Sequence, residues 1–141
     1  MICHSHSLEF AGTSGTDIHD ITSAVAQVVS ASGVDMGVVT VHAPGSTAAV
    51  TTIEYESGAL ADLVRVLEEI APAGGDYAHN QRWHDGNGYS HVRAALMGPS
   101  LSVPIQDGAP VLGTWQQMVL LDFDNKARSR RLVVQVLGVA A

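Results

Sequence analysis

Seven histidines stand in this chain of 141 residues, and three of them, His79, His84 and His91, fall within a short polar stretch. Neutral imidazole is a common ligand for zinc and related ions, and these histidines with a carboxylate such as Glu54 would leave a coordination position open for water or substrate. Their intervals of five and seven residues match no compact helical metal motif. A site for Mg²⁺ or Zn²⁺ is therefore one interpretation, and a hydrated loop with scattered histidines is the other.

His91 is the most informative of the three histidines. Ser90 is suited to cap a short helix that Gly98 would end, which places His91 in its first turn. The unpaired backbone N–H groups of a helix start can hold a phosphate, and Arg93 lies nearby in the sequence. We expect a metal or anion contact here, with a capped surface helix and a solvated histidine as the alternative.

Carboxylates and amides supply further candidates. Glu54 and Glu56 would share one side of a strand if the extended conformation continues, and could then hold Mg²⁺ or act as a base. Trp115 and Gln116 stand at the entry of a strand, where the tryptophan is typical of a core and the amide could read the polar edge of a heteroaromatic ring. The Arg-rich turn at 128–131 is typical of a solvated surface.

The composition limits the classes of function. Fourteen acidic against seven basic residues give a net charge of −7, which disfavours nucleic acids and anionic lipid surfaces. A phosphorylated small molecule remains compatible, because a local group of N–H donors and one arginine can bind an anion. No stretch approaches the roughly 18 consecutive apolar residues of a membrane helix. The single cysteine, Cys3, fits a reducing cytoplasm.

The hydrophobic pattern predicts one α+β domain over residues 1–141, with two layers and the helices on one face of a sheet. A helix starting at Thr16 or Asp17 and ending before Gly33 is expected, as is one capped by Ser57 and ended by Pro72. Residues 74–89 are expected to form a polar loop, which is where chemistry should be sought. Strands are expected at 5–10, 36–42, 46–55, 101–105, 116–123 and 131–137.

Four segments together carry a family resemblance. They are Gly45–Leu63 (GSTAAVTTIEYESGALADL), Tyr77–Asn80 (YAHN), Asp85–Ile105 (DGNGYSHVRAALMGPSLSVPI) and Gly113–Arg131, which begins GTWQQMVLLDFD. The set resembles the YjbQ family, also called secondary thiamine-phosphate synthases, over nearly the whole chain. The resemblance implies helices packed on a coiled mixed or antiparallel sheet, assembly as a homotrimer, and binding of a small phosphorylated heterocycle.

The resemblance also implies an activity and its residues. A hydroxymethylpyrimidine diphosphate is joined to a thiazole phosphate with release of pyrophosphate, an activity regarded as weak and secondary in the family. The family's conserved histidines and glutamate fall on His79, His91 and Glu54, which we take as catalytic. His79, His91 and His84 are the expected metal ligands. The expected substrate-binding residues are Asn87, Ser90, Arg93, Ser100, Trp115 and Gln116.

This sequence departs from the family pattern at two positions. Gly45 stands where many members have histidine, and Ile53 stands where they have asparagine. A metal site built on three histidines would thus lack one ligand. His42 or His84 could substitute, water could fill the gap, or this branch could bind metal poorly. A metal-assisted hydrolase or phosphatase, and a non-catalytic trimeric metal or ligand-binding protein, are the alternatives to the synthase.

Overall fold

The computed structural model describes all 141 residues as eight strands and four helices. In chain order they are β1 (Ile2–Ala11), β2 (Asp17–Asp20), α1 (Thr22–Ser32), β3 (Met36–His42), β4 (Ala48–Ile53), α2 (Ser57–Ile70), α3 (Ala78–Trp83), α4 (Gly88–Met97), β5 (Ser100–Gln106), β6 (Ala109–Pro110), β7 (Gln117–Asp122) and β8 (Ser129–Val139). The predicted α+β class is confirmed.

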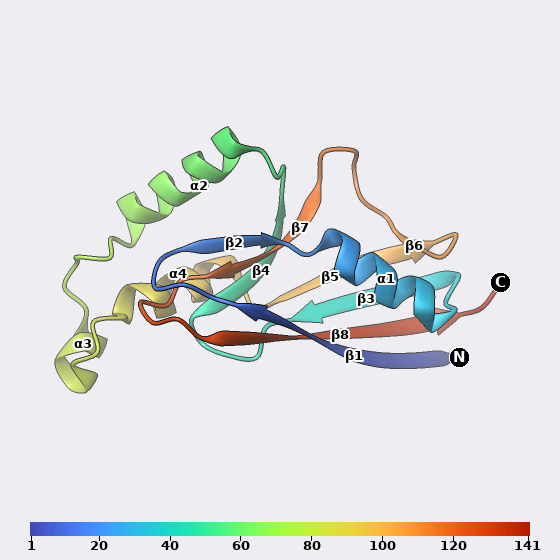
Figure 1. Cartoon of the computed structure of the whole chain (residues 1–141), viewed down its shortest axis with the longest axis horizontal. Coiled ribbons are helices and arrows are strands. Elements are labelled where there is room, and N and C mark those ends of the chain that lie inside the picture. Colours follow the sequence, from blue (N-terminus) through green and yellow to red (C-terminus); the bar gives the residue numbers. More distant parts are fainter.

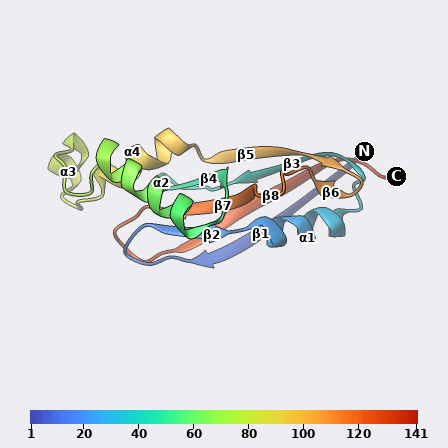
Figure 2. The same ribbon diagram turned by 90° about the horizontal axis from the view of Figure 1, so that it is seen from above.

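The strands form two sheets. One has five strands in the order β1-β8-β3-β5-β6, and the other has three in the order β2-β7-β4. All strand pairs are antiparallel. Figure 1 shows the two chain termini and α1 at one end of the molecule, and α3 at the opposite end. Seen from above, β5 and α1 run along opposite edges of the view (Figure 2).

Two apolar cores explain how the helices are placed. The larger core lies between the sheets and includes Val39 of β3, Leu120 of β7, Leu132 of β8 and Val25 of α1. The smaller core joins the outer face of the three-stranded sheet to α2 and α4, through residues such as Leu67. Strand β7 is therefore covered on both faces, which is why its four central residues, Met118–Leu121, are all apolar.

The start of the first predicted helix is wrong. Residues Asp17–Asp20 form β2, and α1 begins only at Thr22 after Ile21. Ile18 and Ile21 have helical spacing, but β2 pairs with β7, so Ile18 packs in the smaller core and Ile21 in the larger one. Tertiary pairing has overridden the local pattern.

The helix caps and the polar loop also differ from expectation. Glu56, not Ser57, caps α2, with its carboxylate accepting from the backbone N–H groups of Gly58 and Ala59. Strand β4 ends at Ile53, and the backbone N–H of Glu56 donates to the carbonyl of Glu54 at 2.9 Å. This turn means that Glu56 does not continue a strand face with Glu54. The expected loop at 74–89 contains α3, six residues long.

The prediction that Ser90 caps α4 is wrong: the N-cap is Asn87, so the helix begins at Gly88, three residues earlier than expected. Its last residue is Met97, and Gly98 ends it as predicted. No helix of the structure is long and apolar enough to span a bilayer.

Candidate functional site

A pocket of about 390 Å³ lies beside α3 and the start of α4. Two helices, three loops and the start of β8 contribute to it. Its lining comprises Gly45, Ser46 and Thr47 before β4, His79 and Trp83 of α3, Asp85 and Asn87 between the helices, His91 of α4, and Asp124, Arg128 and Arg130 around the start of β8. Polar and ionisable side chains dominate this lining, and it holds both imidazoles and guanidinium groups.

Two histidines meet in this pocket. The ring centroids of His79 and His91 are 4.3 Å apart, with the rings tilted by 42°. Nδ1 of His79 lies 3.5 Å from Oδ1 of Asp85 and makes no hydrogen bond. The pair is formed because the turn after α3 folds the chain back, and Asn80 secures that turn by accepting the backbone N–H of Gly88 at 2.8 Å. The prediction that His79 and His91 lie together agrees with this arrangement.

Arg130 lies against a fully buried carboxylate. Its Nε and Nη2 donate to the two oxygens of Asp122 at 2.9 and 2.8 Å, and Nη2 also donates to Thr47. The pKa of the guanidinium is raised, chiefly by the hydrogen bonds to Asp122. Nη1 donates to no protein atom, and it is the nearest atom that a Cβ at Gly45 would meet, at 3.6 Å. The open edge of a mostly buried arginine thus lies at the pocket.

Arg128 is held in a similar way. Its Nε donates to Asp124 at 2.7 Å, while its Nη groups have no protein partner. Burial raises the pKa of Asp124, but hydrogen bonds from Arg128, Asn87 and Thr47 outweigh it and hold the pKa below its usual value. The amide of Asn87 lies 3.4 Å from Asp124 and, in its alternative orientation, 2.9 Å from Asp85.

These contacts give the pocket directional donors. Asp122 pairs with Arg130 and Asp124 pairs with Arg128, and the remaining edges of the two guanidinium groups have no protein acceptor. Charge-assisted hydrogen bonds from such edges are the usual means of holding phosphate oxygens. The arrangement can therefore bind an anionic group beside two imidazoles.

The structure separates the other residues predicted on α4. Asn87 lines the pocket, but Ser90 is buried and donates to the Asn87 carbonyl at 2.6 Å. Arg93 points away from the pocket, since its Nε bonds the Ala71 carbonyl and its Nη2 pairs with Glu68. His84 ends α3 with φ 56° and does not line the pocket.

The residues predicted on the strands lie elsewhere. Glu54 and Trp115 line a different pocket, and Trp115 is 73% exposed instead of belonging to the core. The Gln116 amide is engaged by Thr52 and by the backbone of Gly113. Ser100 bonds Nδ1 of His42 at 2.5 Å on the five-stranded sheet, so His42 is not a pocket residue.

The predicted Mg²⁺ or Zn²⁺ was assigned to His79, His91 and His84. The first two are adjacent and the third is not a lining residue. No group of three or more His, Cys, Asp and Glu side chains is placed to share a metal ion. The residues present do not fit a closed metal site within one chain, and no chemical step below depends on a metal.

The sequence-based interpretation of the Arg-rich turn is wrong for Arg130. In β8, Arg130 is in phase with Leu132 and Val134, whose side chains are buried, whereas Arg131 alternates to the exposed side. That alternation was a usable signal. Its partner Asp122 belongs to β7, and no local pattern could have paired them.

Comparison with known proteins now places the chain. The family model described as UPF0047 protein YjbQ-like matches residues 6–139. The chain belongs to the YjbQ family. A UPF0047 protein of Methanothermobacter thermautotrophicus is 36% identical, over 98% of this chain and 94% of the relative. A UPF0047 protein of Archaeoglobus fulgidus is 37% identical, over 86% of this chain and 91% of the relative.

Solved structures of YjbQ proteins have the same fold. A YbjQ-like protein of unknown function from Sulfolobus solfataricus P2 matches with a TM-score of 0.87 and 27% identity, covering 97% of this chain and 99% of that one. A YjbQ/UPF0047 protein from Clostridium acetobutylicum matches with a TM-score of 0.83 and 32% identity, covering 95% and 99%.

Membership of the YjbQ family bears on Gly45. Its φ of 147° disfavours a side chain, and Gly45 lines the same pocket as His79 and His91. The Cβ of the histidine predicted here from the family pattern would have Nη1 of Arg130 as its nearest neighbour, at 3.6 Å. Its absence leaves the pocket with two imidazoles and an open arginine edge.

Proposed function

We propose that this YjbQ chain is a thiamine-phosphate synthase-like transferase, which joins a hydroxymethylpyrimidine diphosphate to a thiazole phosphate and releases pyrophosphate. The observation that carries the proposal is the free guanidinium edges of Arg128 and Arg130 beside His79 and His91. The diphosphate is the group that this pocket would hold.

The chemistry requires few side chains. The thiazole nitrogen attacks the pyrimidine methylene, the bond from that carbon to the diphosphate oxygen breaks, and the electron pair leaves with pyrophosphate. Donors aimed at the departing oxygens stabilise the developing negative charge. Arg128 and Arg130 supply those donors, His91 adds a further one, and no nucleophilic side chain is needed. Trp83, exposed at the pocket wall, offers a flat surface for a heterocyclic ring.

Assembly as a homotrimer in the cytoplasm belongs to the same proposal. Support for a partner surface comes from Ile70 of α2 and Leu96 of α4, whose apolar side chains are mostly exposed. Glu54 and Trp115 lie outside the pocket of their own chain, so they take no part in the single-chain site proposed here.

The test is thiamine phosphate formation from the two precursors with added Mg²⁺. We expect product only when both precursors are present, and a loss of about a hundredfold in rate for His91→Ala, as when one transition-state donor is removed. His84→Ala, outside the pocket, should keep the rate. An equal loss in His84→Ala would instead favour a three-histidine metal site. Absence of product from the parent, or equal product from parent and His91→Ala, would refute the synthase and leave a hydrolase or binding role.

A further inference from the structure

A second cavity adjoins the pocket proposed above for the diphosphate. It has a volume of about 290 Å³ and lies between α4, the start of β4 and the loop that leads into β4. Gly45, Ser46 and His91 line both cavities, so these three residues form the boundary between them. We call the second cavity the alanine pocket and define it by the lining residues that the diphosphate pocket lacks, which are Ala48, Ala94, Ala95 and Pro99.

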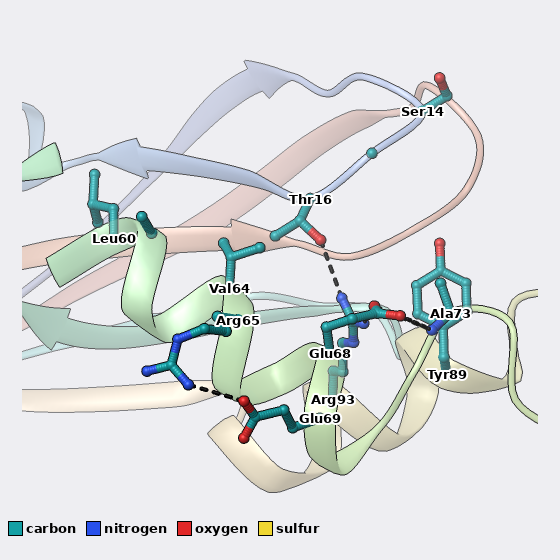
Figure 3. A pocket seen from close by; sticks show the side chains of 12 residues that line it. Ser14, Thr16, Leu60, Val64, Arg65, Glu68, Glu69, Ala73, Tyr89 and Arg93 are labelled. Carbon is teal, nitrogen blue, oxygen red and sulfur yellow. Dashed lines mark hydrogen bonds and ion pairs between the residues drawn. The ribbon is translucent and has the colours of Figure 1, made fainter. Parts of the chain in front are cut away.

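Helix α4 forms a common wall of the two cavities. Residues four apart share a helix face, so Ala95 lies one turn after His91 on the same side of α4. Tyr89 and Arg93 lie on another side, where they line a groove beside α2 (Figure 3). The guanidinium of Arg93 pairs there with Glu68. The alanine pocket accordingly has no Asp, Glu, Lys or Arg in its lining.

The two adjoining cavities differ in chemistry. The diphosphate pocket offers the guanidinium edges of Arg128 and Arg130, whereas the alanine pocket offers methyl groups and a proline ring. An ester of a diphosphate is divided in the same way, because its anionic end is joined to an uncharged organic body. Gly45 adds no side chain at the boundary that such a molecule would cross.

We infer that the alanine pocket holds the organic body, a single small ring, of the diphosphate ester whose anionic end lies beside Arg128 and Arg130. The inference rests on the proposed diphosphate site and adds the shape of its substrate. Pockets for drug-sized ligands have about 300–1,000 Å³, so a cavity of about 290 Å³ suits one ring better than the larger body of a nucleoside. The pyrimidine of the proposed reaction meets this limit. Trp83 lines only the diphosphate pocket, which leaves its ring to face the second heterocycle.

The probes for the alanine pocket are methyl diphosphate and benzyl diphosphate, two esters of the same charge that differ by one ring. Each is titrated calorimetrically into the parent protein. We expect benzyl diphosphate to bind about tenfold or more tightly than methyl diphosphate, because its ring is buried among methyl groups. Ala95→Leu should remove this advantage by filling the alanine pocket, and should leave the affinity for methyl diphosphate unchanged. Leucine is a strong helix former, so α4 should tolerate it at this exposed position.

Ala78→Leu is the matched control. Ala78 is also an exposed alanine of a helix, and it lines neither cavity although His79 follows it. This variant should keep the advantage of the benzyl ester, and circular dichroism checks that both variants fold.

The outcomes separate the inference from the proposed function. Equal binding of the two esters to the parent, or an unchanged advantage in Ala95→Leu, would overturn the inference and leave the diphosphate site in place. Equal loss of affinity for both esters in Ala95→Leu would also overturn it, because the leucine would then act on the anionic end. If neither ester binds to the parent, the proposed diphosphate site fails and the inference fails with it.

Discussion

At the residue scale, the buried pair of Asp122 and Arg130 supports the pocket. Both carboxylate oxygens of Asp122 accept from the guanidinium, and the carboxylate has no exposure to solvent. The pair fixes the direction of the free Nη1 edge toward Gly45. Asp122 therefore positions the Arg130 donor of the pocket without itself contacting a ligand.

The first prediction concerns this pair. Asp122→Asn removes the negative charge but keeps the shape, leaving a mostly buried guanidinium without its counter-charge. We expect a loss of about 3 kcal/mol in the free energy of unfolding, measured by urea denaturation. Asp62→Asn is the control, because Asp62 pairs with Arg65 at 3.8 Å on the surface. It should cost less than about 1 kcal/mol. Similar losses of unfolding free energy in the two variants would show that the buried pair stabilises the fold no more than the surface pair does.

The sequence predicted contacts between site residues that are close along the chain, and it missed contacts between residues that are far apart. His79 and His91 are twelve positions apart and were predicted together, because the segment between them is short. Arg130 was not predicted as a residue of the site, because its burial and orientation depend on its pairing with Asp122 in another strand. Ser90, Arg93 and Ser100 were grouped with the site by motif, and the fold turns their side chains to other partners.

At the element scale, α2 was predicted with nearly its observed bounds because its apolar stripe is long and regular. Strand β2 was missed because it has only four residues, and because Ile18 and the following Ile21 have helical spacing. Pairing with β7 is what makes this segment a strand. Helix α3 was missed because six residues in a polar segment are too short to show periodicity. The cap of α2 was placed one residue late, since Glu56 caps less commonly than serine.

Glu56 gives a prediction that depends on pH. Hydrogen bonds from the backbone N–H groups of Gly58 and Ala59 hold its pKa below the ordinary value of 4.5. A lowered pKa means that the carboxylate stabilises the folded form above the ordinary value, and that this contribution disappears as the pH falls through the lowered one. Glu56→Ala should therefore lower the Tm at neutral pH, and the difference from the parent should shrink in acid.

Calorimetric scans at neutral pH and near pH 3, roughly one unit or more below the ordinary glutamate value, measure the effect. Glu54→Ala is the control, as the neighbouring carboxylate caps no helix. A Tm difference for Glu56→Ala that stays constant with pH would contradict the assigned role of the charge.

At the scale of the whole molecule, the net charge opposes the proposed ligand. A chain of charge −7 repels a polyanion at long range, so diphosphate binding must come from local contacts. The two arginines of the pocket, with edges not engaged by protein acceptors, are the contacts available. Binding should accordingly depend on single arginines and not on the overall count of basic residues.

The most direct test of the account is a calorimetric titration of pyrophosphate into the parent protein, Arg128→Gln and Arg131→Gln. Arg128 lines the pocket and is half-exposed. Arg131, also near the start of β8, is exposed and lies outside the pocket. Loss of one charge-assisted hydrogen bond should weaken binding to Arg128→Gln about tenfold or more. Arg131→Gln should bind as the parent does. Absence of pyrophosphate binding to the parent, or equal weakening in both variants, would contradict the proposed diphosphate site.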